Sequence, residues 1–167
     1  MSSNPGGDNN KREDNFQLIQ QKIIHSSADL TCEPTQILFN WWNSFAPNFP
    51  SREDWDILNF PALAPHIYLI ECISDGHYLY RLCGNDVGEL IGNHYRMIDI
   101  SVDSEKYDDR KLAEYLESIK NHKTANGCTG NLSFVDRDFI NFESVDCPLM
   151  DEAGNLTHFI GVLCEVR

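Results

Sequence analysis

The side chains best suited to chemistry in this 167-residue chain are its histidines and cysteines, six of each. Two metal ligands on one helix face need a spacing such as His-x-x-x-His, or a glutamate that flanks the pair. The six histidines are scattered, and no two of them have that spacing. The sequence therefore predicts no dedicated metal site.

Nucleophilic catalysis needs a serine on a G-x-S-x-G turn or a cysteine with an orienting histidine. Neither pattern occurs, and the phosphate-binding patterns G-x-G-x-x-G and G-x-x-x-x-G-K-[ST] are absent as well. Acidic pairs such as Asp108-Asp109 and Asp151-Glu152 fall on faces predicted to be in solvent. We therefore predict that the chain is not an enzyme.

The cysteines indicate a compartment rather than a reaction. Their number is even, but no two are spaced as C-x-x-C, and several lie inside apolar runs. That usage is typical of buried, reduced thiols in a cytosolic protein rather than of a disulfide framework. The six are Cys32, Cys72, Cys83, Cys128, Cys147 and Cys164.

The charge of the chain argues against two classes of partner. Thirteen basic side chains stand against 26 acidic ones, for a net charge of -13. This balance opposes attraction to nucleic-acid phosphates and to anionic membrane surfaces. No apolar stretch approaches the roughly 20 residues that span a bilayer, and the N terminus has no apolar signal region. We predict a cytoplasmic protein with no direct nucleic-acid or membrane contact.

The elements that must position any site begin after a polar N terminus. Residues 1–15 are mostly Ser, Asn, Gly and charged residues, a composition that predicts a disordered tail. Over residues 16–30, Phe16, Ile19 and Ile23 recur at helical spacing, which predicts an amphipathic helix. Residues 31–167 then have the length and apolar content of one domain.

The domain begins with a helix from Pro34, followed by two strands, further helices and three strands. Strands at 66–73 and 77–83 form a hairpin around a Ser-Asp-Gly turn. A short helix at 86–91 and a longer one at 101–120 follow. Three strands, at 128–135, 139–149 and 156–166, complete an α+β domain.

The apolar positions of the strand at 139–149 change parity along its length. Ile140 and Phe142 are followed by Val145, an odd spacing for side chains that alternate with period two. The change predicts a β-bulge near Glu143 and Ser144.

Several local sequences resemble the PAS domain family, in particular single-domain PAS proteins of alphaproteobacteria. The similarity spans the chain from Pro34 to Arg167. The matching segments are Trp41-Trp42, Pro50-Ser51-Arg52, Leu63-Ala64-Pro65-His66, Tyr80-Arg81-Leu82-Cys83-Gly84, Gly88-Glu89-Leu90-Ile91-Gly92 and Cys147-Pro148-Leu149-Met150-Asp151-Glu152-Ala153-Gly154.

The resemblance implies a five-stranded antiparallel sheet with helices on one face, enclosing a small cavity. PAS domains bind haem, flavin or small metabolites, or dimerise without a ligand. A flavin photoadduct needs a cysteine on the short helix, and the region Asn85 to Arg96 contains none. Haem-binding relatives present an axial histidine from the long helix, where His122 lies. We favour a different role for His122, as a cation at the helix C terminus, and the cofactor stays open.

Strand alternation selects the residues that face this cavity. Gly161 stands between large neighbours and leaves room for a ligand or for a ring that fills the space, and we expect a packed core. The pocket candidates are Tyr80, Leu82, Leu116, Ile119, Leu132, Phe134, Phe159 and Gly161.

The other face of the last strand carries an apolar stripe that includes Ile160 and Val162. Such a stripe needs a cover. Either Phe16, Ile19 and Ile23 on the predicted N-terminal helix cover it, or a second copy does, and we predict a homodimer through these residues.

The leading function is a sensor or interaction module in signal transduction that acts on a separate regulatory protein, with or without a small ligand in its cavity. No effector domain is evident in the sequence. One alternative is a ligand-free scaffold or dimerisation protein. The other is a small-molecule enzyme on the same scaffold, which would need a titratable group in the pocket. The resemblance indicates the fold more strongly than the function.

Overall fold

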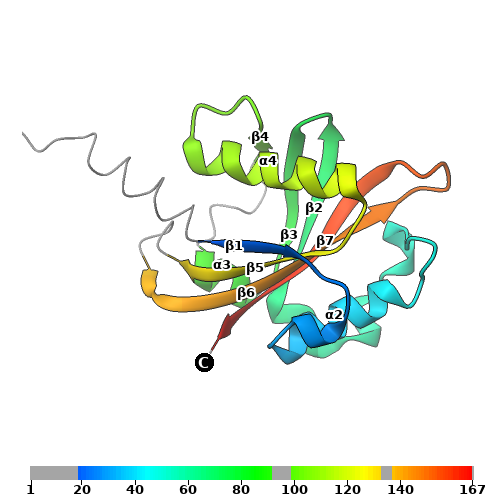
Figure 1. Cartoon of the computed structure of the whole chain (residues 1–167), viewed down its shortest axis with the longest axis horizontal. Coiled ribbons are helices and arrows are strands. Elements are labelled where there is room, and N and C mark those ends of the chain that lie inside the picture. The colour runs from blue at the N-terminus through cyan, green and yellow to red at the C-terminus, as the bar shows by residue number, and fades with distance from the viewer. Residues whose placement is uncertain (1–18, 92–98, 133–136, 167) are drawn as a thin grey trace, which may run out of the picture.

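The computed structural model describes residues 19–91, 99–132 and 137–166 (Figure 1). Short 3-10 turns, at Ser27–Asp29, Arg52–Asp54, Ile57–Asn59 and Pro61–His66, connect the longer elements. The strands are β1 (Gln20–Ile23), β2 (Ile67–Ser74), β3 (His77–Cys83), β4 (Asp99–Ser101), β5 (Asn126–Leu132), β6 (Arg137–Met150) and β7 (Leu156–Val166), and the helices are α2 (Glu33–Asn43), α3 (Asn85–Ile91) and α4 (Tyr107–His122).

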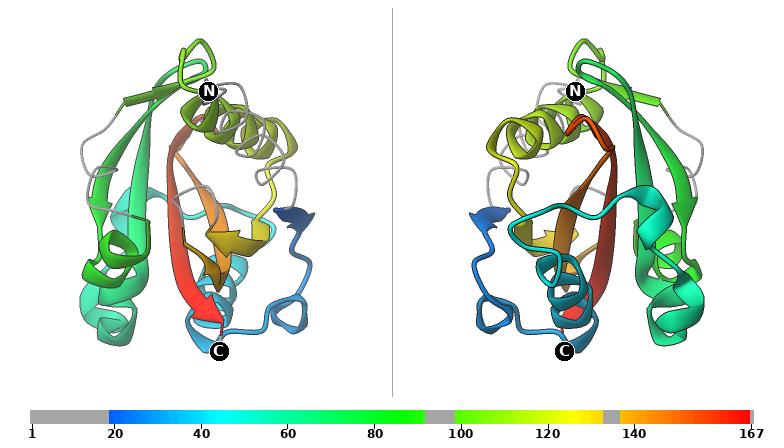
Figure 2. Two further views of the ribbon diagram at one scale, coloured as in Figure 1. Left: turned by 90° about the vertical axis from the view of Figure 1, so that its left-hand side faces the viewer. Right: turned by 90° about the vertical axis from the view of Figure 1, so that its right-hand side faces the viewer.

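One antiparallel sheet contains all seven strands in the order β1-β5-β6-β7-β2-β3-β4. The α+β class is confirmed, and so are the five strands that the sequence predicts. The two additional strands, β1 and β4, are short and lie at the two edges. The sheet is curled, and α4 lies over its concave face with β3 and β4 on one side and β1 on the other (Figure 2).

Each face of the sheet has its own apolar core. On the inner face, Leu116 and Ile119 of α4 are fully buried in one cluster with Tyr78 and Phe159. On the outer face, α2 and the 3-10 turns cover a second cluster that includes Val162. Helices therefore cover both faces, whereas the sequence predicts them on one.

The predicted helix over residues 16–30 is wrong for the residues that the structure describes. Residues 20–23 form β1, which pairs with β5, and a 3-10 turn follows. Two glycines in β5 make room for the flanking isoleucines: a Cβ on Gly130 would lie 3.3 Å from Ile19, and one on Gly127 would lie 2.9 Å from Ile24. Isoleucine favours strands. The pairing of β1 with β5 therefore determines the conformation of this segment, although its apolar residues recur at helical spacing.

The predicted bulge near Glu143 and Ser144 is also wrong. β6 pairs with β7 in regular register from Asn141 to Leu149. The parity change has a different cause, because Phe142 belongs to the inner core whereas Val145 belongs to the outer one. A strand with a core on each face can change its buried side without any irregularity.

Glu143 fixes the start of α2 on the outer face. Its carboxylate accepts hydrogen bonds from the backbone N–H of Thr31 at 2.9 Å and of Cys32 at 2.9 Å, and from the hydroxyl of Thr35 at 2.5 Å. Cys32 is the N-cap residue of α2 and its own side chain provides no cap. A carboxylate from β6 therefore satisfies backbone donors that the helix start leaves unpaired.

The bonds to Glu143 also determine its protonation. Burial raises its pKa, but the hydroxyl of Thr35 and the two backbone donors outweigh that effect, and the pKa lies below its usual 4.5. A carboxyl with a lowered pKa contributes stability above the unfolded-state value. That contribution is lost as the pH falls through the folded-state pKa.

Replacing Glu143 by glutamine is expected to lower the free energy of unfolding at neutral pH by about 1–3 kcal/mol, because buried donors lose a charged acceptor. Urea unfolding at a series of pH values measures the difference between wild type and variant. The difference should shrink below pH 4.5, where the wild-type carboxyl takes up its proton. A constant difference down to about pH 3 would contradict this role.

Candidate functional site

A buried carboxylate occupies the centre of the inner face. Asp146 of β6 is 3% exposed, in a core that is otherwise mainly apolar. Tyr68 of β2 donates a short hydrogen bond to its Oδ1, and Tyr115 of α4 donates to its Oδ2 at 2.8 Å. Three elements that are far apart in sequence are thereby joined at one charged group.

Gly161 makes the bond between Tyr68 and Asp146 possible. It pairs with Asp146 on one side and with Tyr68 on the other, so β7 lies between the two partners. A Cβ on Gly161 would lie 2.1 Å from the Tyr68 ring. The Tyr68 ring therefore occupies the space that a side chain at position 161 would take. Its hydroxyl reaches across β7 to Asp146 of β6.

Burial dominates the electrostatics of this cluster. It raises the pKa of Asp146 to about 6, although the two tyrosine hydroxyls favour the charged form and limit the rise. Burial also raises the pKa of both tyrosines well above its ordinary value, and that of the neighbouring Cys128 thiol to about 12. A thiol with such a pKa is a weak nucleophile at neutral pH.

The structure brings four of the predicted pocket residues together in the inner core. Tyr80, Leu116, Ile119 and Phe159 are all buried there, and the Tyr80 ring centroid lies 6.1 Å from that of Tyr68. Gly161 faces the same core, where it lies beneath the Tyr68 ring. Leu132 ends β5, its side chain lies outside what the structure describes, and Phe134 lies outside the described residues.

Leu82 is the exception among the pocket candidates, because it faces outward. Leu69 pairs with Leu82 and Ile70 pairs with Tyr80, so Arg81 is an extra residue between two ladder positions. This bulge reverses the alternation. Leu82 is 44% exposed and lines a groove on the outer face together with Leu69 and Ile160.

The predicted dimer face is wrong for two of its residues. Ile160 and Val162 are 1% and 0% exposed within the single chain, beneath α2 and the 3-10 turns. Ile19 packs against the inner core, and Ile23 on the edge strand is 40% exposed. Phe16 lies outside the described residues.

His122, the position considered for a haem ligand, is an exposed residue at the C-terminal end of α4. It is not part of the inner core. Within residues 19–91, 99–132 and 137–166, no group of three His, Cys, Asp or Glu side chains could hold a metal ion. No helix in these ranges is both long and apolar enough to cross a membrane.

Sequence reasoning missed the three residues that define the site. Tyr68 and Tyr115 resemble ordinary core residues, since nothing in their spacing indicates a shared partner. Asp146 could have been recognised from the sequence, because it is a single carboxylate between the apolar residues Val145 and Cys147 of a predicted strand. A buried acid in such a place needs donors, and tyrosine hydroxyls provide them here.

Comparison with known families identifies the fold. A family model described as a PAS domain matches residues 30–164. The chain belongs to the PAS domain family. Members of this family are generally sensory or signalling modules. Among curated proteins, none is similar enough to this PAS domain to count as a match.

The solved structures that resemble this PAS domain include two signalling proteins. One, an RNA-binding light-oxygen-voltage receptor, matches 89% of the chain with a TM-score of 0.50 and 16% identity. The PAS domain spans 38% of that protein. The other is a sensory box histidine kinase/response regulator from Burkholderia thailandensis E264, with a TM-score of 0.40 and 16% identity over 66% of this chain and 85% of that one. At this identity, the first similarity shows the fold alone.

A double-mutant cycle tests the packing of Tyr68 over Gly161. Gly161→Ala should destabilise the wild type by about 1–3 kcal/mol, because its methyl group overlaps the ring. The Tyr68→Leu variant lacks the distal ring atoms. In that background, Gly161→Ala should lower the free energy of unfolding by less than half as much as it does in the wild type. The measurement is urea unfolding of all four proteins. Equal costs in the two backgrounds would show that the ring lies elsewhere.

The titration of Asp146 provides a second test. Its pKa rises from 3.8 to about 6 on folding, so the folded state binds the extra proton, and this residue's contribution to stability falls as the pH rises from about 4 to about 6. Asp146→Asn should flatten the pH dependence in that window relative to wild type. Carbon NMR of the carboxyl group measures the pKa directly, and an apparent value near 4 would refute the assignment.

Proposed function

We propose that this PAS domain is a signalling module that acts on a separate regulatory protein and needs no bound haem or flavin. The observation that carries the proposal is the position of Tyr68. Its ring fills the space above Gly161, where strand alternation predicts room for either a ligand or an aromatic ring. Both carboxylate oxygens of Asp146 already accept hydrogen bonds from tyrosines, so the polar centre is satisfied without a ligand.

The inner core offers little for catalysis, which supports a role other than an enzyme. A general acid or base must reach a substrate. Asp146 instead lies between two tyrosines at 3% exposure. A cytoplasmic location is supported by the cysteines, all six of which are free, as a reducing compartment favours.

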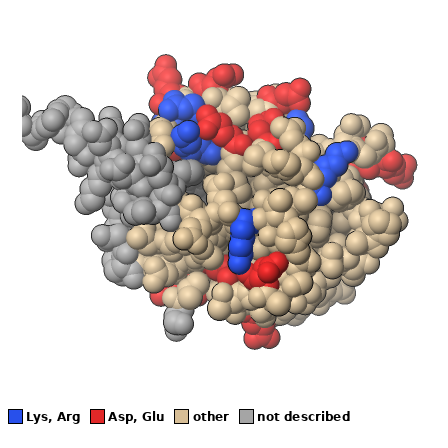
Figure 3. Space-filling model, viewed as in Figure 1, with Lys and Arg blue, Asp and Glu red and all other residues tan. Residues whose placement is uncertain are grey.

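The charge of the surface fits a partner with a basic face. The chain carries a net charge of -13, and on the face in Figure 3 acidic side chains lie over the region of α4 with basic ones among them. The first turn of that helix contains Asp108 and Asp109. Complementary charge raises the rate of association more than the affinity.

We also propose that the protein is a homodimer in which β1 of one copy meets β1 of the other. β1 is an edge strand of the sheet, and all four of its residues are exposed. Edge strands present unpaired backbone groups that a second strand can use. Ile23 adds an apolar side chain that is 40% exposed.

Native mass spectrometry and an absorption scan of the purified chain test the ligand-free proposal. The expected spectrum shows no mass of a haem or a flavin, and the absorption scan shows no visible band. Additional mass equal to that of a haem or a flavin, or the corresponding absorption band, would overturn the proposal and make the protein a cofactor-binding sensor.

Sedimentation of Ile23→Glu tests the dimer. The variant should be a monomer at tens of micromolar, a concentration at which the wild type is a dimer, because each copy would place a charge in the contact. Ile73→Glu is the control, since Ile73 is similarly exposed at 44% but lies in β2, away from the edge strand. A monomeric wild type, or a dimeric Ile23→Glu, would contradict the contact.

A further inference from the structure

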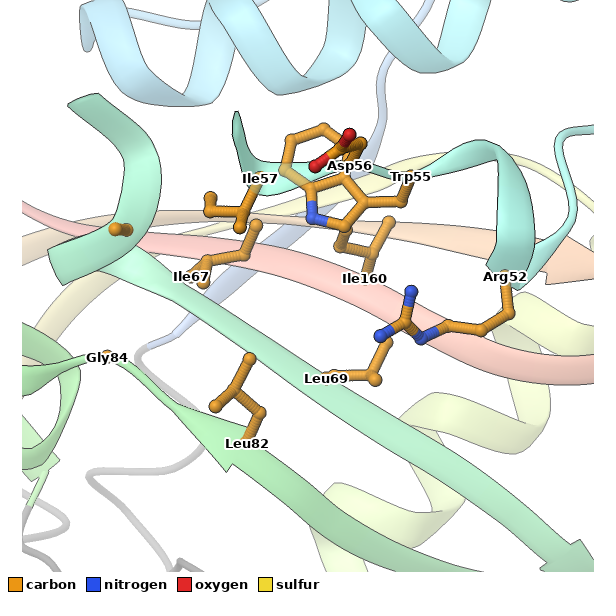
Figure 4. A pocket seen from close by; sticks show the side chains of 10 residues that line it. Arg52, Trp55, Asp56, Ile57, Ile67, Leu69, Leu82, Gly84 and Ile160 are labelled. Atoms are coloured by element: carbon orange, nitrogen blue, oxygen red, sulfur yellow. The ribbon is translucent and has the colours of Figure 1, made fainter. Parts of the chain in front are cut away.

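A preformed groove lies on the outer face of the sheet, on the opposite side from Asp146. Its volume is about 380 Å³, near the lower end of the range for small-molecule sites. The floor consists of Ile67, Leu69 and Ile160, and Leu82 forms one side through the bulge at Arg81 (Figure 4).

The opposite side of the groove is held rigidly by aromatic contacts. Trp55 stacks on Phe60, with ring centroids 5.2 Å apart and an interplanar angle of 6°. It also meets Trp41 edge-on at 4.8 Å. Because Ile67, Leu69 and Ile160 are at most 7% exposed, the floor is equally fixed. An occupant would therefore enter a groove that needs little rearrangement, which lowers the cost of binding.

One cation lies at this apolar surface. The Arg52 guanidinium extends over Leu69 (Figure 4). Its side chain makes no hydrogen bond or ion pair with any residue that the structure describes. Asp56, which also lines the groove, uses its carboxylate to cap the backbone N–H of Leu58 at 2.9 Å.

Two of the neighbouring charged side chains are paired with each other. Glu71 and Arg81 form an ion pair at 2.5 Å on the adjacent strands. Arg52 and Glu53 influence the pKa of His158, as do Glu71 and Arg81, so these groups share one neighbourhood. Arg52 is thus the cation at the groove whose side chain has no partner within the described residues.

We propose that this groove binds a small apolar monocarboxylic acid, with its carboxylate on Arg52 and its hydrocarbon part against Leu69, Ile160 and Leu82. A planar guanidinium binds a carboxylate with two parallel hydrogen bonds. The floor of Ile67, Leu69 and Ile160, together with Leu82, accepts a hydrocarbon. A net charge of -13 disfavours ligands with several negative charges. The site goes beyond the proposed function, because it gives the outer face a ligand of its own.

Isothermal titration of the full chain with octanoate, and with octanamide as its uncharged analogue, tests the proposal. Octanoate should bind one molecule per chain and at least about ten-fold more tightly than octanamide, as a charged hydrogen bond predicts. Arg52→Gln should lower octanoate affinity to that of octanamide. Arg110→Gln is the control, because it removes an arginine of α4, a helix that packs on the other face of the sheet, and it should leave octanoate affinity unchanged.

A second variant tests whether the ligand binds in this groove. Leu82 is 44% exposed, so Leu82→Ser should fold normally and should weaken octanoate and octanamide equally. The proposal is overturned if acid and amide bind alike, if Arg52→Gln retains octanoate affinity, or if neither probe saturates. A peptide with a C-terminal leucine that binds more tightly than octanoate would assign the groove to a partner protein instead. Displacement of a second copy by octanoate would assign it to self-association.

Discussion

The inner face of this PAS domain depends on one buried carboxylate and the tyrosine that reaches it across a strand. Asp146 lies in a core that would reject an isolated charge. Tyr68 can satisfy it only by passing over β7, and only a residue without a side chain lets it pass. Gly161, Tyr68 and Asp146 therefore form one steric and electrostatic unit. Tyr115 links α4 to the same carboxylate, so the position of that helix depends on the unit as well.

β6 carries a second buried carboxylate, Glu143, whose pKa is shifted in the opposite direction from that of Asp146. Glu143 and Asp146 are three residues apart, which places them on opposite faces of the sheet. Both are nearly buried. Glu143 accepts from two backbone donors and a hydroxyl, and these bonds outweigh burial and lower its pKa. Asp146 accepts from two phenol hydroxyls, which do not outweigh burial, and its pKa rises. The depth of burial and the type and number of donors together decide which carboxyl keeps its proton, since Asp146 lies deeper in the protein than Glu143.

The sequence predicts the strands and helices of the domain well and its side-chain contacts poorly. The hairpin at 67–83, α4 and the last three strands follow from local patterns. The segment at 20–23 does not, because its conformation depends on Gly127 and Gly130 more than a hundred residues later. Alternation correctly assigns Tyr80 and Phe159 to the inner core. It fails at Leu82, because one extra residue in β3 reverses every later side chain and leaves no signature in the sequence.

That extra residue also connects the two faces. Tyr80 packs beside Tyr68 in the inner core, and Leu82, two residues later on the same strand, lines the outer groove. Between them Arg81 is held by Glu71 of β2. An occupant of the groove would press on Leu82 and Leu69, which are paired across β3 and β2. The next pair along the same two strands, Tyr80 and Ile70, lies in the inner core, next to Tyr68. The groove on one face and the Tyr68–Asp146 contact on the other therefore depend on neighbouring residue pairs of the same two strands.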